Sequence, residues 1–293
     1  MRTEVLCLGE TMAMVTPAAP EPLDEAMGLR LDVGGAESTV ALYLADLGHR
    51  AAWASRVGDD PFGRRIVTLL TRQGVDVSHV RLDDRAPTGV YFKDPGDGAT
   101  RVLYYRSGSA ASRLSVADLA GLPLDEVPLV HLTGITPALS LSCYDLTDAV
   151  LDRELPVSFD VNYRPGLWPV AEAAPVLLEL SGRADIVFVG QDEAETLWGA
   201  GTPRAVRDLI GAARLVVKDG AVGATEFAGG RETFVPAPHA EVVEPVGAGD
   251  AFAAGYLSGL LRDSAPAECL SRGHAVAARA LSGMGDFVAG GEL

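Results

Sequence analysis

A short turn late in the chain carries the residues best suited to chemistry. The run Glu244–Tyr256 contains Gly247-Ala248-Gly249, with Asp250 where an apolar helical pattern begins. The first N–H groups of a helix have no intrahelical acceptor and lie at the positive end of its dipole. Glycine lets an anion approach such a backbone closely, and a neighbouring carboxylate can take a proton from a hydroxyl that attacks phosphorus. Taken alone, the turn also fits an ordinary helix N-cap, because Asp is a common capping residue.

A second glycine-containing block lies near the N-terminus. The stretch Asp32–Gly48 places Gly34-Gly35 directly before an apolar helical pattern, and Ala52–Gly63 follows with the pattern of a strand, a turn and a helix start. In their order and separation, this block and the late turn resemble the two signatures of the ribokinase-like (PfkB) family of carbohydrate kinases. The resemblance covers nearly the whole chain. It implies a kinase that uses ATP and Mg²⁺ to phosphorylate a small-molecule sugar.

The composition indicates a globular protein and excludes several partners. Of the 293 residues, 48% are hydrophobic and 22% are charged, which is enough apolar material for a sizeable core. The formal net charge of −16 argues against nucleic acid or an anionic membrane as a partner. No apolar run is long enough to span a bilayer. The only lysines are Lys93 and Lys218, a bias toward arginine that we attribute to genome composition.

The cysteines and histidines give no metal-site pattern. Cys7, Cys143 and Cys269 are widely separated, and the five histidines are scattered. This spacing predicts free buried thiols and a reducing, cytoplasmic location.

Strand-like segments alternate with helical patterns along most of the chain. The expected strands are Val5–Gly9, Ala51–Val57, Val127–Thr133, Val157–Val161, Ile186–Val189 and Leu215–Lys218. The expected helices are Glu37–Leu47, Pro61–Gln73, Ser140–Glu154, Ala171–Arg183, Asp192–Gly199, Pro203–Ala213, Gly249–Arg262 and Pro266–Ser282. The alternation predicts a mostly parallel central sheet covered by helices on both faces. The resemblance implies a single ribokinase-like three-layer α/β/α domain over residues 1–293.

Two segments, about 12–33 and 88–106, depart from this alternation. The second contains the short alternating runs Thr88–Lys93 and Arg101–Arg106. The alternation of apolar and polar residues in these runs fits edge hairpins as well as a separate small sheet. The resemblance implies a small β-sheet lid over the sugar, whose exposed face would join subunits into a homo-oligomer.

Phosphoryl transfer requires mainly positioning and charge stabilisation from the protein. The resemblance assigns Asp250 as the general base that deprotonates the sugar hydroxyl. The turn Gly247-Ala248-Gly249, with the backbone N–H of Asp250, would stabilise charge on the transferred phosphoryl group.

The nucleotide is expected beside the carboxyl ends of the later strands. The run Lys218–Ala224 matches a strand and glycine turn of the family, although each glycine also fits an ordinary hairpin. The family has an Asn-x-x-Glu motif that organises Mg²⁺ through water; here the Asn position is Gly190, and only Glu193 is retained. The residues expected to bind the cofactor are Glu193, Lys218, Gly220, Gly223, Val246, Gly247, Gly249 and Ala275, with Glu193 holding the metal through water.

Several runs resemble the 2-keto-3-deoxygluconate kinases of this family: Gly9–Pro17, Tyr104–Arg106, His131–Pro137 and Asp160–Trp168. Arg106 and Arg164 would supply two guanidinium groups for one sugar carboxylate, although either also fits a structural ion pair in so acidic a protein. The residues expected to bind the sugar are Gly34, Gly35, Thr39, Tyr91, Tyr104, Arg106, Arg164, Asp250 and Asp286.

Two departures keep other functions open. Thr39 stands where the family usually has asparagine, and the sequence ends soon after Asp286. The expected reaction is phosphorylation of 2-keto-3-deoxygluconate at its 6-hydroxyl. The alternatives are a kinase for a neutral sugar such as fructose or ribose, and a sugar-binding regulator without catalysis.

Overall fold

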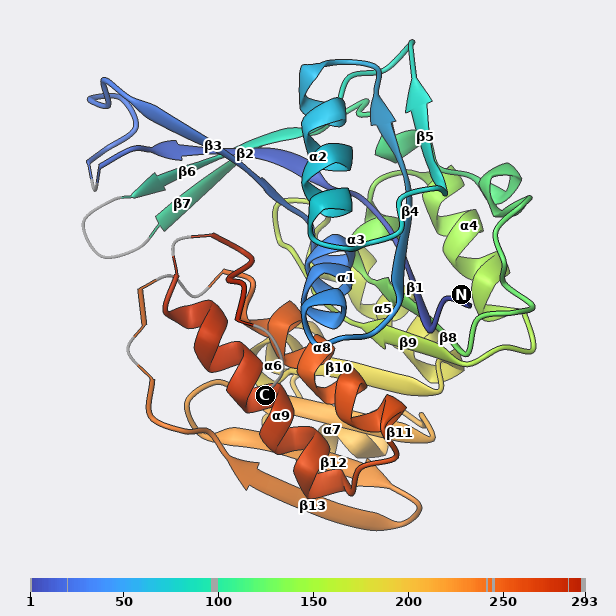
Figure 1. Ribbon diagram of the computed structural model, residues 1–293. Coiled ribbons are helices and arrows are strands. Elements are labelled where there is room, and N and C mark those ends of the chain that lie inside the picture. Colours follow the sequence, from blue (N-terminus) through green and yellow to red (C-terminus); the bar gives the residue numbers. More distant parts are fainter. Residues whose placement is uncertain are drawn as a thin grey trace.

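The computed structural model describes residues 2–19, 21–95, 100–240, 242–243, 246–283 and 285–290. Within these residues, a large sheet of nine strands has the order β13-β12-β11-β10-β9-β8-β1-β4-β5 (Figure 1). The strands are β1 (Val5–Leu8), β4 (Ala51–Gly58), β5 (Val80–Asp83), β8 (Leu129–Thr133), β9 (Val157–Asp160), β10 (Ile186–Gly190), β11 (Arg214–Asp219), β12 (Gly223–Ala228) and β13 (Arg231–Pro236). All neighbours from β11 to β5 are parallel, whereas β12 and β13 add antiparallel strands at one edge.

Helices cover both faces of this sheet (Figure 1). One face is covered by α1 (Ala36–Asp46), α2 (Pro61–Arg72), α8 (Ala248–Leu261) and α9 (Pro266–Leu281). The other face is covered by α4 (Leu141–Leu151), α5 (Val170–Arg183), α6 (Gln191–Trp198) and α7 (Pro203–Leu209), with the short α3 (Ile135–Ala138) packed on α4. The expected three-layer α/β/α fold is therefore confirmed.

The alternation of side chains along the strands creates two separate cores. In β1, Leu6 and Leu8 pack into the core beneath α4 and α5, whereas Val5 and Cys7 pack into the core beneath α1 and α8. Successive side chains of a strand point to opposite faces, so a strand covered on both faces is apolar throughout. This explains why the apolar runs identified in the sequence form the buried central strands.

A second sheet, which we call the small sheet, extends away from the large one (Figure 1). Its strands have the order β3-β2-β6-β7, with β2 (Met12–Pro17), β3 (Leu29–Gly34), β6 (Val90–Pro95) and β7 (Thr100–Tyr105). β2 pairs in parallel with β6, and the other two pairs are antiparallel. All four strands come from the two segments that interrupt the strand–helix alternation.

The main differences from the expectations concern one helix end and three strands. The helix that begins at Pro203 ends at Leu209 and not at Ala213, because Arg214 already starts β11. The hairpin β12–β13 and the edge strand β5 were not expected. β5 and β13 have exposed positions, and the buried β12 contains the polar residues Thr225 and Glu226, so the apolar pattern of all three is weaker than that of the central strands.

In the described part of the chain, no helix has both the length and the apolar character needed to cross a membrane. Cys7, Cys143 and Cys269 are free and buried, as expected.

Candidate active site

A pocket of about 770 Å³ is shared by the small sheet and by the segments that follow the central strands. The small sheet lines it with Met12, Tyr91, Val102 and Tyr104, and α8 lines it with Gly249 and Asp250. The carboxyl ends of parallel strands meet at one edge of a sheet, which is where open α/β folds bind ligands. The pocket is large enough for a sugar and a nucleotide to lie side by side.

The first turn of α8 forms the floor of this pocket. Gly247, with φ of +88°, precedes the helix, and the N–H of Ala251 donates to the Gly247 carbonyl at 2.9 Å. A Cβ at position 247 would lie 3.1 Å from the backbone of Asp286, so glycine satisfies both the left-handed conformation and the close contact. Gly247, Ala248 and Gly249 all line the pocket. Glu244 and Pro245, which open this run, lie outside the described residues.

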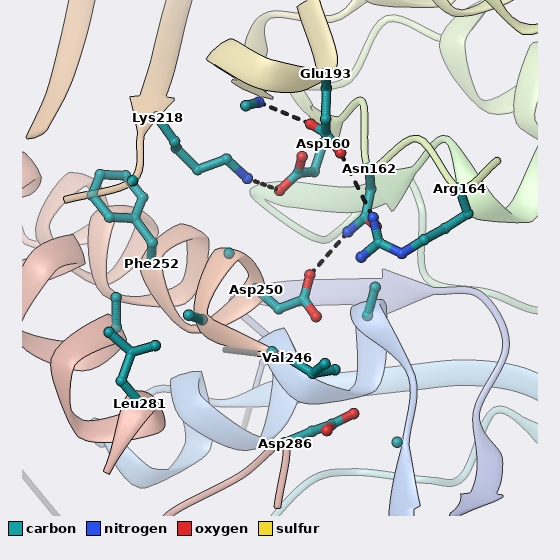
Figure 2. A pocket seen from close by; sticks show the side chains of 18 of the residues that line it. Asp160, Asn162, Arg164, Glu193, Lys218, Val246, Asp250, Phe252, Leu281 and Asp286 are labelled. Carbon is teal, nitrogen blue, oxygen red and sulfur yellow. Dashed lines mark hydrogen bonds and ion pairs between the residues drawn. The ribbon is translucent and has the colours of Figure 1, made fainter. Parts of the chain in front are cut away.

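Asp250 lies in that turn with its carboxylate at the pocket (Figure 2). The Nδ2 of Asn162 donates a hydrogen bond of 3.0 Å to Oδ1 of Asp250. Burial, together with the negative charge of Asp160, raises the pKa of Asp250 to about 7, against the opposing effects of Arg164 and Lys218. A carboxylate that changes protonation state near neutral pH suits a general base.

Lys218 and Asp160 form an ion pair beside this turn (Figure 2). The Nζ of Lys218, near the end of β11, donates to Oδ2 of Asp160, the last residue of β9, at 2.7 Å. The other oxygen of Asp160, Oδ1, is buried and has no hydrogen-bond partner among the residues that the structure describes. The ammonium also lies close to Gly249, since a Cβ there would be 3.4 Å from Nζ. A cation beside the N-terminus of α8 reinforces the positive potential at the turn Gly247-Ala248-Gly249.

Glu193 lies in the first turn of α6. Its Oε2 accepts a hydrogen bond of 2.8 Å from the N–H of Gly190, and its Oε1 lies 3.7 Å from Nη1 of Arg164. Burial and the charge of Asp160 raise the pKa of Glu193, against the opposing effect of Lys218. Glu193 therefore caps its own helix and also presents negative charge to the pocket.

The acidic groups fit a magnesium ion held through water. Among the described residues, His, Cys, Asp and Glu side chains form no group of three or more that could enclose a metal directly. Mg²⁺ usually keeps several waters and binds through one or two carboxylates together with substrate phosphates. The unpartnered Oδ1 of Asp160 and the carboxylate of Glu193 are suitable acceptors for such waters.

Arg106 lies at the end of the small sheet and is already paired. Its Nε donates to Oε2 of Glu10 at 2.6 Å, and its Nη2 contacts the same oxygen. The hydroxyl of Ser109 donates to Oε1 of Glu10 at 2.5 Å. Arg106 and Glu10 both line the pocket, and both are buried. Of the two expected carboxylate-binding arginines, Arg106 therefore shares its charge with a buried glutamate, whereas Arg164 is 40% exposed.

The opposite wall contains Asp286, Tyr91 and Gly34. The Tyr91 hydroxyl donates to Oδ2 of Asp286 at 3.0 Å, and the Nζ of Lys93 donates to Oδ1 at 3.0 Å. A Cβ at Gly34 would overlap both the Tyr91 hydroxyl and the Asp286 carboxylate, which explains the glycine. Tyr104 lines the same region, and its ring centroid lies 5.8 Å from that of Tyr91.

The apolar end of the pocket is formed by one face of α9. His274, Ala277, Ala278 and Leu281 recur at helical spacing and line it, and Val246, Gly220 and Gly223 lie along the same pocket. Ala275 is an exposed residue on another face of α9 and is not among the described residues that line the pocket. Of the residues expected to bind the cofactor, Ala275 therefore faces away from the pocket, whereas its neighbours Ala277 and Ala278 line it, because a helix turns by about 100° per residue.

Thr39 also lies away from the cavity. Thr39 is buried in α1, with 1% of its surface exposed. Among the described residues, the preceding Gly34, Gly35 and Ala36 line the pocket, but Thr39 does not. The structure thus brings together the other expected sugar-binding residues, but it separates Thr39 from them.

Four residues were not singled out from the sequence: Glu10, Asp160 and Asn162, which line the pocket, and Lys93, which pairs with the pocket residue Asp286. Asp160 and Asn162 lie in the run Asp160–Trp168, which we used only to compare sugar specificity. For Lys93, the available signal was the rarity of lysine in the sequence. Genome composition alone does not account for the two lysines, because both pair with carboxylates that line the pocket.

Comparison with known proteins identifies the family. Residues 2–287 match the family described as pfkB family carbohydrate kinase. The chain belongs to the pfkB family of carbohydrate kinases. It is therefore a phosphotransferase that acts on a sugar hydroxyl, as the resemblance implied.

The similar pfkB-family proteins cover nearly the full chain. The 2-dehydro-3-deoxygluconokinase of Bacillus subtilis (strain 168) is 38% identical, over 98% of this chain and 92% of the relative. The 2-dehydro-3-deoxygalactonokinase of Haloferax volcanii is 31% identical, over 98% and 93%. The crystal structure of a PfkB protein from Polaromonas sp. JS666 has a TM-score of 0.88 at 36% identity and covers 97% of both chains.

Proposed function

We propose that this kinase transfers the γ-phosphoryl group of ATP to the 6-hydroxyl of 2-keto-3-deoxygluconate (2-dehydro-3-deoxygluconate). The observation that carries the proposal is the position of Asp250, a carboxylate with a pKa of about 7 in the first turn of a helix that lines the pocket. The similarity to the B. subtilis 2-dehydro-3-deoxygluconokinase supports the choice of sugar.

In the proposed reaction, Asp250 takes the proton of the 6-hydroxyl as its oxygen attacks the γ-phosphorus of ATP. The bond from the γ-phosphorus to the β–γ bridging oxygen breaks, and ADP leaves with that oxygen. The backbone N–H groups of Ala248, Gly249 and Asp250 would bind the transferred phosphoryl group. Lys218 would add positive charge beside it.

Magnesium, when bound with ATP, neutralises charge on the phosphates. Glu193 and Asp160 would hold its waters, and the ion pair of Asp160 with Lys218 fixes the direction of one carboxylate. The chain provides these two acceptors without the asparagine of the family motif, since Gly190 occupies that position.

The sugar carboxylate would be held mainly by Arg164. This guanidinium lines the pocket and is partly exposed; its Nη1 donates to the carbonyl of the adjacent Tyr163 at 3.0 Å and lies 3.7 Å from Oε1 of Glu193. Arg106 would contribute through the edge of its guanidinium that Glu10 does not occupy. Small-sheet residues Tyr91 and Tyr104 would cover the sugar, and the exposed side chains of Leu29 and Tyr105 would serve subunit association.

One observation favours a second candidate. Glu10 neutralises part of the charge of Arg106, so the pocket holds less positive charge than two unpaired arginines would give. This arrangement also fits a neutral sugar, and a probable fructokinase of Arabidopsis thaliana is 30% identical over 89% of this chain.

The test is ADP release by the purified chain with ATP and Mg²⁺ on a panel of sugars. The panel contains 2-keto-3-deoxygluconate, its C4 epimer 2-keto-3-deoxygalactonate, gluconate, fructose and ribose. We expect turnover with the keto-deoxy acids alone. Turnover confined to fructose or ribose would show that the substrate is a neutral sugar, and the role of Asp250 as general base would stand. No ADP release with any sugar would contradict the proposed kinase reaction.

A further inference from the structure

Lys93 and Lys218 each form an ion pair with a carboxylate that lines the pocket. Lys218 pairs with Asp160 at 2.7 Å, and Lys93 pairs with Asp286 at 3.0 Å. Genome bias toward arginine does not explain why lysine remains at these two positions. Lys93 is 2% exposed, and unlike Lys218 it is not among the described residues that line the pocket. Lys93 contacts Asp286, so an effect of Lys93 on the sugar can be transmitted by this carboxylate.

Asp286 lies between the sugar-binding and the phosphoryl-binding turns. A Cβ at Gly34 would overlap the Asp286 carboxylate, and a Cβ at Gly247 would lie 3.1 Å from the Asp286 backbone. The aspartate thus contacts the turn that precedes α1 and the turn that opens α8. A sugar whose terminal hydroxyl meets Asp250 would therefore bring an inner hydroxyl to Asp286.

Both donors to Asp286 come from one face of β6. Tyr91 and Lys93 are two residues apart in this strand, so their side chains lie on the same face. Each donates to a different oxygen of the carboxylate. A carboxylate has about four acceptor positions, so two remain for a ligand. Asp286 is 7% exposed, and a buried carboxylate is costly unless it is paired with a positive charge and hydrogen-bonded, as it is here by Lys93 and Tyr91.

We propose that Lys93 is a positioning residue for the sugar site, which orients the Asp286 carboxylate so that it accepts a hydrogen bond from an inner hydroxyl of the sugar. The inference rests on the proposed kinase function. In 2-keto-3-deoxygluconate, C3 has no hydroxyl, so the inner hydroxyls are those on C4 and C5. Lys93 would thereby help to select the stereochemistry of the sugar without touching it.

The test compares the wild-type chain with Lys93→Met, using the sugar that the wild type phosphorylates best. We expect the sugar KM to rise about 10- to 100-fold, the range for loss of a hydrogen bond to a charged group. The KM for ATP should change less than about twofold, because Asp286 lies on the sugar side. Lys93→Gln keeps a hydrogen-bond donor without the charge, so its sugar KM should lie between those of the wild type and Lys93→Met. It also provides a folded variant if Lys93→Met is unstable.

Deoxy analogues of the same sugar, each lacking one inner hydroxyl, separate positioning from a structural effect. With the analogue that lacks the hydroxyl bound by Asp286, wild type and Lys93→Met should have equal KM values. If Lys93→Met raised the KM by the same factor for every analogue, the proposal would be overturned, because this result would indicate a general destabilisation of the small sheet.

Arg214→Met is the matched control. Arg214 forms an ion pair with buried Glu226, and neither residue is among the described residues that line the pocket. This variant should lose thermal stability and keep the sugar KM of the wild type. If the wild type is inactive on all sugars, the proposed function fails. If it is active and Lys93→Met has an unchanged sugar KM, only the role of Lys93 fails.

Discussion

Asn162 donates a hydrogen bond of 3.0 Å from its Nδ2 to Oδ1 of Asp250, and thereby joins the segment after β9 to the first turn of α8. Asn162 has φ of +40°, a left-handed conformation that costs about 1 kcal/mol or more for most side chains. The hydrogen bond occupies one oxygen of the proposed base and leaves Oδ2 to face a sugar hydroxyl.

Removal of the Asn162 amide should therefore slow the chemical step. We expect Asn162→Gly to lower kcat about 10-fold, because Asp250 loses the donor that orients it. Asn162→Ala loses the same donor but also keeps a Cβ in the left-handed region, so it should be less stable than the glycine variant by about 1 kcal/mol. Equal kcat for the wild type and Asn162→Gly would show that the hydrogen bond has no part in catalysis. Steady-state kinetics and thermal unfolding measure the two effects.

Asp250→Asn should abolish most of the turnover and leave sugar binding intact. General acid–base catalysis contributes about 10²–10⁴-fold, so kcat should fall by that factor, while calorimetry should give a sugar Kd near that of the wild type. A variant with wild-type kcat would exclude Asp250 as the base.

The same variant should be more stable than the wild type above neutral pH. The pKa of Asp250 is raised from its ordinary value of 3.8 to about 7, so ionisation of this buried group opposes folding. The stability contributed by the protonated form is complete below about pH 4 and is lost as the pH rises toward 7. At pH 8 we expect Asp250→Asn to gain about 4 kcal/mol relative to the wild type, with little difference at pH 4, because each pKa unit corresponds to about 1.4 kcal/mol. Thermal melts at the two pH values would contradict this if the gain were the same at both.

The pH profile of kcat/KM should report the same group. The base must be deprotonated, so activity should rise with pH through about 7. The positive charge of Arg164 lowers the pKa of Asp250, and Arg164→Ala should therefore move this limb to higher pH. Arg204→Ala, which removes an exposed arginine paired with Glu232, is a control that should leave the profile in place. An unmoved limb in Arg164→Ala would mean that the two groups do not interact.

Glu193→Gln should raise the Mg²⁺ concentration needed for half-maximal activity. Glutamine retains an oxygen that can accept from the N–H of Gly190, so the helix cap and the melting temperature should be largely preserved. Only the negative charge is removed, and we expect a shift of about 10-fold. Glu195→Gln, on the same helix and exposed, serves as the control. An identical Mg²⁺ requirement in Glu193→Gln would remove Glu193 from the metal site.

The sequence predicted the layered fold because strand and helix periods differ and because buried parallel strands are apolar on both faces. The strand from Val157 and the helix from Pro61 were placed to within one residue of their ends. The hairpin β12–β13 was not expected, since its exposed edge strand has only a weak apolar pattern.

For the site, the sequence determined which backbone turns can bind an anion and which carboxylate follows them. Gly247-Ala248-Gly249-Asp250 is a contiguous run, so its residue types and spacing can be read from the sequence directly. The partners of Asp250 come from a distant segment and are decided by the order of strands in the sheet. Only the tertiary structure shows that Asn162 contacts Asp250 and that Lys93 contacts Asp286.

The tertiary structure also decided the directions of side chains. Arg106 had the right residue type to bind a sugar carboxylate, but the fold pairs it with Glu10. Thr39 and Ala275 lie in helices that contribute to the site, yet the helical turn directs both away from the cavity. The pattern of residue types is encoded locally, whereas hydrogen bonds and pKa values depend on burial and on charges brought together from distant parts of the chain.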